Sequence, residues 1–211
     1  MELSMTILSE AEVYDVLSPY HDRIQTIVER AWTEWRVTAE FRTKNNLGPV
    51  LYPRTMTNYV FDAIARFAIA EFADDSTVSA KVESQTVKFF FKGMVLGRFK
   101  KGDEGNLGQN ITTQAVLNFI ETDGVLPGMP PETAKVEFVW RSNELNTQLQ
   151  HVFVVARDHN RLLWQYEIGG SAAGTGTVIP FPESPKGPAD GADDDLVKPK
   201  LPAEKQEQDT E

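Results

Sequence analysis

The hydrophobic period of the chain changes near residue 76, and this change constrains the fold more than any other feature. Before that point apolar residues recur at steps of three and four, as at Ile24, Ile27 and Val28. After it they alternate with polar residues, as at Val78 and Ala80. The first pattern is typical of helices with one buried face, and the second of half-buried strands. We therefore expect helices first and strands after them.

Two helix starts are visible near the N-terminus. Ser9 followed by Glu12 has the spacing of a capping box, in which each side chain bonds the backbone N–H of the other residue. Ser18-Pro19 resembles the N-cap and first residue of a longer helix. The predicted buried stripe of that helix is Tyr20, Ile24, Ile27, Val28, Ala31, Trp35 and Ala39.

A second long helix is predicted after a break. Residues 45–53 are rich in Asn, Gly and Pro, which interrupts the helical pattern. Apolar residues then recur at helical steps from Phe61 to Phe72, and Asp74 to Ser76 ends this helix.

The remaining pattern predicts two groups of strands around one short helix. Lys92-Gly93 and residues 158–160 are the predicted hairpin turns, and Thr112 or Thr113 is predicted to cap a helix that runs through Phe119. The expected fold class is α+β, with N-terminal helices packed on a mainly antiparallel sheet and one inserted short helix. The predicted strands are residues 78–82, 87–91, 94–100, 136–140, 151–157 and 161–168.

The composition changes near Gly169. Residues 171–211 are rich in Gly, Pro, Ala, Asp and Glu, and their four lysines and nine acidic residues give a net charge of −5. A segment with so few apolar side chains does not bury enough surface to offset its ordering entropy. We therefore predict a single α+β domain at residues 1–169 and a disordered acidic tail at residues 170–211.

Charge and composition argue against several classes of protein and several kinds of site. The 211 residues carry a net charge of −10, which argues against a general nucleic-acid or membrane-surface binder. The absence of cysteine excludes disulfides, thiol catalysis and Cys-ligated zinc. No signal peptide and no apolar run of the ~20 residues that a membrane helix needs are visible, so a soluble cytoplasmic protein is expected.

The densest basic cluster is Arg98-Phe99-Lys100-Lys101. This cluster is either a contact site for phosphate or acidic side chains, or a solvated strand end that Asp103 and Glu104 partly neutralise. The glycine-containing loop that follows, residues 102–108, has neither the Gly-Lys-Ser/Thr end of a P-loop nor the G-x-G-x-x-G motif of a dinucleotide site. Its glycines are interpreted as loop residues with permissive dihedral angles.

The order of helix, three strands, helix and strand resembles that of restriction-endonuclease-like nucleases. Such an enzyme needs an acid-x-Lys pair to hold a divalent metal and orient water. The corresponding stretch here contains Arg98-Phe99-Lys100, in which a cation stands where a carboxylate is needed. Asp62 and Glu83 are isolated acidic candidates. A degenerate, inactive nuclease-like or nucleic-acid-binding protein is therefore the alternative hypothesis.

The histidines and tryptophans suggest no catalytic or metal site. His151 and His159 are placed to face each other across the last hairpin, but two histidines without Cys or a carboxylate triad are weak evidence for zinc. We expect no cofactor and no metal. Trp32 and Trp35 are expected in the core, and either would be an interface anchor if it were exposed.

Three short motifs resemble a family of small bacterial proteins. They are Arg98 to Asp103, then Asn110-Ile111-Thr112-Thr113-Gln114-Ala115, then Leu126 to Pro131. Members of this family resemble companions of proteins that join a helix-turn-helix domain to a zincin-type metallopeptidase, in toxin–antitoxin and phage-defence modules of the Rosmer type. The resemblance implies a non-enzymatic antitoxin-like or regulatory protein that restrains such a partner. The resemblance implies that the polar residues of these motifs either contact the partner or hold the loop; they are Arg98, Lys100, Lys101, Asn110 and Gln114.

One apolar island interrupts the predicted tail. Residues 177–182 contain the apolar side chains Val178, Ile179 and Phe181, and the prolines at 180 and 182 favour extended geometry. The island is either a plain linker or a short motif that docks on the partner or on a second copy of the chain. Ile179 and Phe181 are the residues predicted to make that contact.

Overall fold

The computed structural model describes residues 8–83, 86–109, 114–121, 130 and 133–169. The chain divides into two units, residues 1–176 and 177–211, and the second lies wholly outside the described residues. The predicted tail, with Ile179 and Phe181, lies outside them as well. All structure described below belongs to the first unit.

The N-terminal part of this unit is helical, as the apolar period predicts. The helix α1 spans Glu10–Leu17, a 3-10 turn spans Ser18–Tyr20, α2 spans His21–Lys44 and α3 spans Pro53–Phe72. The predicted capping box of α1 is present, with the Glu12 carboxylate accepting from the Ser9 N–H at 2.7 Å. It satisfies N–H groups that the first helical turn leaves without intrahelical partners.

The start of α2 differs from the prediction. The Ser18 N–H bonds to the Tyr14 carbonyl and its hydroxyl donates to the Asp15 carbonyl, so Ser18 completes α1 and is not an N-cap. Pro19 lies in the 3-10 turn, and α2 begins at His21 without a side-chain cap. The position of Pro53 also differs from the prediction. It was expected in the break between the two long helices, but it is the first residue of α3. The first position of a helix tolerates proline because its N–H would have no partner there.

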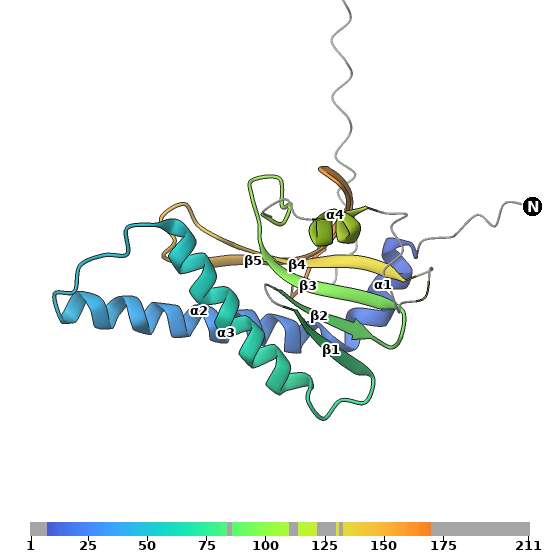
Figure 1. Ribbon diagram of the computed structural model, residues 1–211, viewed down its shortest axis with the longest axis horizontal. Coiled ribbons are helices and arrows are strands. Elements are labelled where there is room, and N and C mark those ends of the chain that lie inside the picture. Colours follow the sequence, from blue (N-terminus) through green and yellow to red (C-terminus); the bar gives the residue numbers. More distant parts are fainter. Residues whose placement is uncertain (1–7, 84–85, 110–113, 122–129, 131–132, 170–211) are drawn as a thin grey trace, which may run out of the picture. The chain divides into compact units, whose positions relative to one another are not determined.

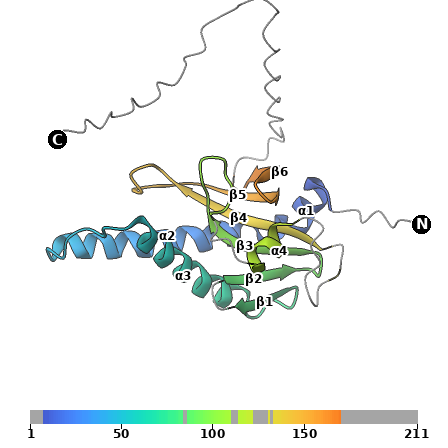
Figure 2. The same cartoon turned by 45° about the horizontal axis from the view of Figure 1, so that its top comes forward.

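Six strands form one sheet in sequence order, β1 to β6 (Figures 1 and 2). Neighbouring strands are antiparallel except β3 and β4, which are parallel. A parallel pair needs a crossover connection, and α4, Gln114–Ile120, lies in it. The predicted α+β class and the inserted short helix are confirmed. The strands are Val78–Glu83, Thr86–Phe91, Val95–Lys101, Ala134–Ser142, Leu149–Asp158 and Arg161–Glu167.

The first three helices cover one face of the sheet, here called the helical face. The core there is rich in aromatic residues, and the Trp32 ring lies 6.1 Å from the Trp140 ring. Both Trp32 and Trp35 are buried, so neither is an exposed anchor. The opposite face, here called the α4 face, is covered where Phe119 and Ile120 pack on Leu96. No helix among the described residues is both long and apolar enough to cross a membrane.

Candidate functional site

The loop that follows β3 is closed by its own backbone and by Asp103. Gly102 and Gly108 form an isolated bridge, and the Asp103 N–H donates to the Leu107 carbonyl at 2.9 Å. The Asp103 carboxylate accepts from the N–H groups of Gly105 and Leu107, each at 2.9 Å. A short acidic side chain of this kind replaces the hydrogen bonds that a strand would otherwise supply. The loop therefore has a defined shape despite its glycines.

The turn between β4 and β5 is closed in a similar way. The Asn143 side-chain oxygen accepts from the N–H groups of Thr147, at 2.7 Å, and Gln148, at 3.2 Å. Asn146 adopts a φ of 51°, in the left-handed region that Asn tolerates better than most residues. Leu145 projects from this turn and is among the most exposed apolar residues of the described chain.

Side chains from β3 and β4 join the two loops. The Lys101 ammonium donates to the Asn146 side-chain oxygen at 3.3 Å, and the Ser142 hydroxyl donates to the same atom at 2.7 Å. Arg141 donates to the Asn106 side-chain oxygen at 2.9 Å. The Lys101–Asn146 and Arg141–Asn106 bonds connect residues that are 45 and 35 positions apart in the sequence.

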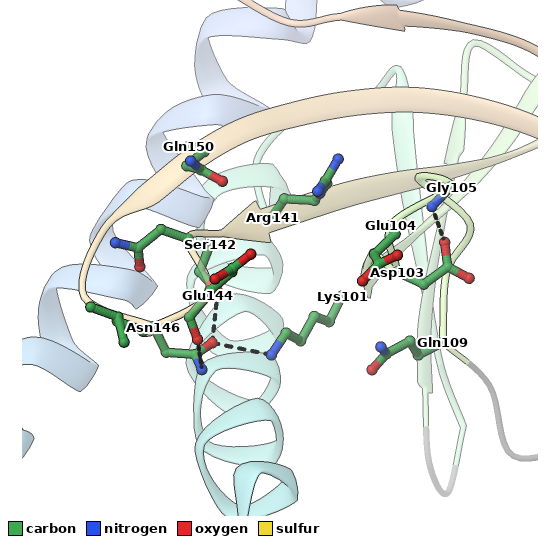
Figure 3. Close-up of a pocket in the computed structure, with 13 residues that line it drawn as sticks. Lys101, Asp103, Glu104, Gly105, Gln109, Arg141, Ser142, Glu144, Asn146 and Gln150 are labelled. Carbon is green, nitrogen blue, oxygen red and sulfur yellow. Dashed lines mark hydrogen bonds between the residues drawn. The ribbon is translucent and has the colours of Figure 1, made fainter.

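A hollow of about 1000 Å³ lies between the two loops (Figure 3). Most of its lining residues are exposed, so the hollow is open to solvent. Its charged side chains are of both signs: Lys101, Arg141, Asp103, Glu104 and Glu144. Small-molecule sites are generally more enclosed and more apolar than this. The hollow is better suited to a polar segment of another macromolecule.

A buried charge cluster lies on the α4 face, beneath the loop after β3. Arg98 and Glu137 occupy paired positions on the parallel strands β3 and β4, and both are almost fully buried. The Arg98 Nε and Nη2 donate to Glu137 Oε1 at 3.1 and 2.5 Å. Arg157 of β5 donates to Glu137 Oε2 at 3.3 Å and to the Gly108 carbonyl at 3.0 Å. Gly108 completes the arrangement by donating its N–H to Glu137 Oε2 at 3.2 Å.

The cluster determines how its members ionise. Burial opposes the ionisation of Glu137, but the guanidiniums of Arg98 and Arg157 outweigh it and hold its pKa below the ordinary value. The ring of Phe119 covers the cluster, with its centroid 4.0 Å from Arg98 Cζ. The carboxylate therefore stays charged at neutral pH and connects Arg98 of β3 to the loop that follows this strand.

Lys100 lies next to this cluster and is half-buried. Burial lowers its pKa to about 8, and the positive charge of Arg98 adds to this effect. Burial also lowers the pKa of Lys101, which lies at the rim of the hollow. The two lysines are therefore less strongly charged than exposed lysines.

The structure separates the residues predicted for partner contact. Arg98 is 1% exposed and ion-paired with Glu137, so it belongs neither to a surface patch nor to a solvated strand end. Lys101 contributes to the hollow, whereas Lys100 does not line it. Gln114 begins α4. Asn110, Ile179 and Phe181 lie outside the described residues.

The acidic and histidine residues considered as metal or catalytic candidates do not form a common site in the structure. Asp62 lies on α3 and pairs with Arg66, whereas Glu83 pairs with Lys88 on the α4 face of the sheet. His151 bonds Glu167, and His159 lies in the turn at the other end of β5, so the two histidines do not face each other as predicted. Within the described residues, no group of three or more His, Asp or Glu side chains is placed to hold a metal ion.

No motif in the sequence marks Glu137, Arg157, Arg141, Asn106 or Asn146 as a site residue. Glu137 alternates with the apolar Val136 and Phe138 in the predicted strand, but the loop after β3 and α4 cover the side of the sheet on which Glu137 lies. The apolar Val139 at the next position on the same side was the available signal, and it is fully buried. Asn106 and Asn146 adopt φ values of 60° and 51°, and asparagine is a residue type that favours such turn positions.

Comparison with protein-family models, with curated proteins and with solved structures finds no match for this chain.

Proposed function

We propose that this chain is a non-enzymatic binding protein of the antitoxin or regulatory kind, which restrains a protein partner by contact through the hollow. The observation that carries the proposal is the open polar hollow, whose two walls are joined by Lys101–Asn146 and Arg141–Asn106 hydrogen bonds. A surface whose side chains are already held in place loses little conformational entropy on binding.

The charges of the hollow suggest what it would recognise. Two cationic and three acidic side chains line it, so a complementary surface would carry both signs. Leu145 stands at the edge as an exposed apolar side chain that a partner would cover. The partner class comes from the family resemblance: a protein that joins a helix-turn-helix domain to a zincin-type metallopeptidase.

The test is co-expression of this chain with such a protein encoded beside it. We expect rescue of growth and co-purification of the two chains. Charge reversal by Lys101→Glu and Arg141→Glu should weaken the complex by at least about tenfold, because both side chains line the hollow. Lys81→Glu, on the exposed edge strand β1, is the matched control. A complex unaffected by the first two variants would overturn the assignment of the hollow, and failure to form any complex would overturn the proposed function.

A second candidate is a nucleic-acid-binding protein with a degenerate restriction-endonuclease-like core. The observation that favours it is topological, since three antiparallel strands are followed by α4 and by a β4 parallel to β3. Arg98 stands where the nuclease would need a metal-binding carboxylate, and it pairs with Glu137. Purified protein with magnesium or manganese should therefore leave DNA and RNA intact. Cleavage that is lost in Glu83→Ala or Asp62→Ala would contradict this expectation.

Nucleic-acid binding separates the two candidates. Any affinity through Lys100 and Lys101 should be weak and steeply salt-dependent, because it would arise from counterion release in a chain of net charge −10. Tight, sequence-specific DNA binding by the isolated chain at physiological salt would favour the second candidate over the first.

A further inference from the structure

We propose that the tip of the α2–α3 hairpin is a second docking surface, for a protein that presents an apolar patch bordered by carboxylates. The hairpin tip consists of residues 36–54, which end α2, connect it to α3 and begin α3. Both views show this connection beyond the sheet (Figures 1 and 2). The inference rests on the proposed function only in that the chain acts by binding protein, and it concerns a surface separate from the hollow.

Large apolar side chains gather at the hairpin tip. Val37 and Phe41 are four residues apart on α2 and therefore lie on one face of the helix. Single exposed apolar residues need no explanation, but a group of them marks an interaction site. The exposed fractions are 62% for Val37, 59% for Phe41, 53% for Leu47, 79% for Leu51 and 61% for Tyr52.

The connection that carries these side chains has a defined conformation. The Leu47 N–H donates to the Arg42 carbonyl at 3.0 Å, and the Arg42 guanidinium donates to the Leu47 carbonyl at 3.2 Å. Asn46 and Gly48 adopt φ values of 53° and 71°, which turn the chain after α2. Val50 packs against the core and anchors the connection. Because its backbone is already held, the hairpin tip loses little entropy when a partner binds.

The charge of the hairpin tip differs from that of the whole chain. Four basic residues and one acidic residue give it a net charge of +3, whereas the chain as a whole carries −10. Lys44 and Arg54 are exposed, and the Arg54 guanidinium lies 5.4 Å from the centre of the Tyr52 ring. Cationic side chains around an apolar surface match a partner whose apolar patch has an acidic border.

The same charges favour a protein partner at the hairpin tip over two other occupants, a second copy of this chain and an anionic bilayer. A second copy of this chain would bring a like charge of +3 to a contact between two tips. An anionic bilayer would extend beyond the hairpin tip, and the remainder of the chain carries a net charge of −13 that it would repel. A protein surface of limited extent has neither disadvantage.

The test uses the full chain and two short labelled helical peptides with the same leucine stripe. One peptide carries Glu at its polar positions and the other carries Lys. Fluorescence anisotropy should show that the Glu peptide binds at least about tenfold more tightly. The double variant Phe41→Ser, Leu51→Ser and the double variant Lys44→Glu, Arg54→Glu should each lose that binding. Val82→Ser, an exposed residue on β1, is the matched control.

The other outcomes identify other occupants. Equal affinity for the two peptides, or binding that survives both double variants, overturns the proposal. Self-association that the Phe41→Ser, Leu51→Ser variant abolishes in sedimentation equilibrium assigns the hairpin tip to a second copy. Binding to vesicles of about 70% phosphatidylcholine and 30% phosphatidylglycerol that the same variant abolishes, without a peptide preference, assigns it to a membrane.

Two further measurements keep this proposal distinct from the proposed function. Lys101→Glu should leave binding of the Glu peptide unchanged, because Lys101 lines the hollow and not the hairpin tip. Loss of peptide binding in Lys101→Glu would overturn the separation of the two surfaces. A complex with the metallopeptidase partner, together with no binding of either peptide, would overturn the inference about the hairpin tip alone.

Discussion

At the residue scale, the Glu137 carboxylate on the α4 face connects β3, β5 and the loop after β3. It pairs with two guanidiniums, those of Arg98 and Arg157, and accepts the Gly108 N–H inside the protein. Removing one member of a buried ion pair leaves the other charge without compensation, which costs about 3–5 kcal/mol. We therefore expect Glu137→Gln to lower the free energy of unfolding by that amount in urea titrations.

The control for this variant is Glu40→Gln. Glu40 pairs with Lys44 on the exposed surface of α2, and both side chains are more than half exposed. Exposed pairs of this kind contribute about 0–1 kcal/mol. Equal effects of the two variants would show that the buried cluster adds no more stability than a surface pair.

Lys100 provides a second prediction at this scale, concerning pH. Its folded-state pKa of about 8 is below the ordinary value of 10.5, so between these values the unfolded chain binds more protons than the folded chain. Stability attributable to Lys100 therefore rises with pH across this window. Lys100→Met should raise the free energy of unfolding at pH 7 by about 1–2 kcal/mol, less than the full pKa difference implies because the side chain is partly exposed.

This gain should shrink as the pH rises from about 8 towards 10.5, and denaturant titrations across that range measure it. Lys44→Met, on the exposed end of α2, is the control. A gain that stays constant with pH would mean that Met stabilises by packing and not by removing a charge.

At the element scale, the parallel pair of β3 and β4 depends on a glycine. A Cβ at Gly97 would lie 2.4 Å from an atom of the Phe138 ring on β4. Phe138 is buried among other aromatic rings and has little room to move, so Gly97→Ala should destabilise the protein by about 1–3 kcal/mol. Thermal unfolding measures the difference.

Gly105→Ala is the matched glycine control. Its added methyl group would meet only the Asp103 side-chain oxygen at 3.4 Å. The Gly105 N–H that donates to Asp103 is retained in alanine. If Gly105→Ala lowered the melting temperature as much as Gly97→Ala, close packing against Phe138 would not explain the loss.

At the scale of the whole molecule, the docking of residues 177–182 on a partner stays a prediction. If residues 177–182 dock on the proposed partner, a chain that ends at Gly176 should bind that partner more weakly than one that ends at Pro185, because the apolar side chains of the island would be missing. Phe181→Ala in the full chain should reproduce part of the loss. Equal affinities in isothermal titration calorimetry for both truncations would assign the segment to a linker.

The sequence by itself determined the order of the elements. The change of period near residue 76 and the pattern after it correctly predict helices, then three strands, a helix and three strands. Local signals also located the α1 capping box and the Lys92-Gly93 turn, where both residues have positive φ. These features depend on neighbours close in the chain, and the sequence displays such neighbours directly.

The tertiary structure alone decided which polar residues are buried. Alternation along β4 marks two sides of a strand, but it does not reveal that α4 and the loop after β3 cover the second side. Arg98 and Glu137 are 39 residues apart and become neighbours only through the parallel register of β3 and β4. The hollow has the same origin, because Lys101 and Asn146 meet only when distant loops reach the same end of the sheet. Contacts between residues so far apart in the chain depend on strand pairing and crossover geometry, which local patterns do not specify.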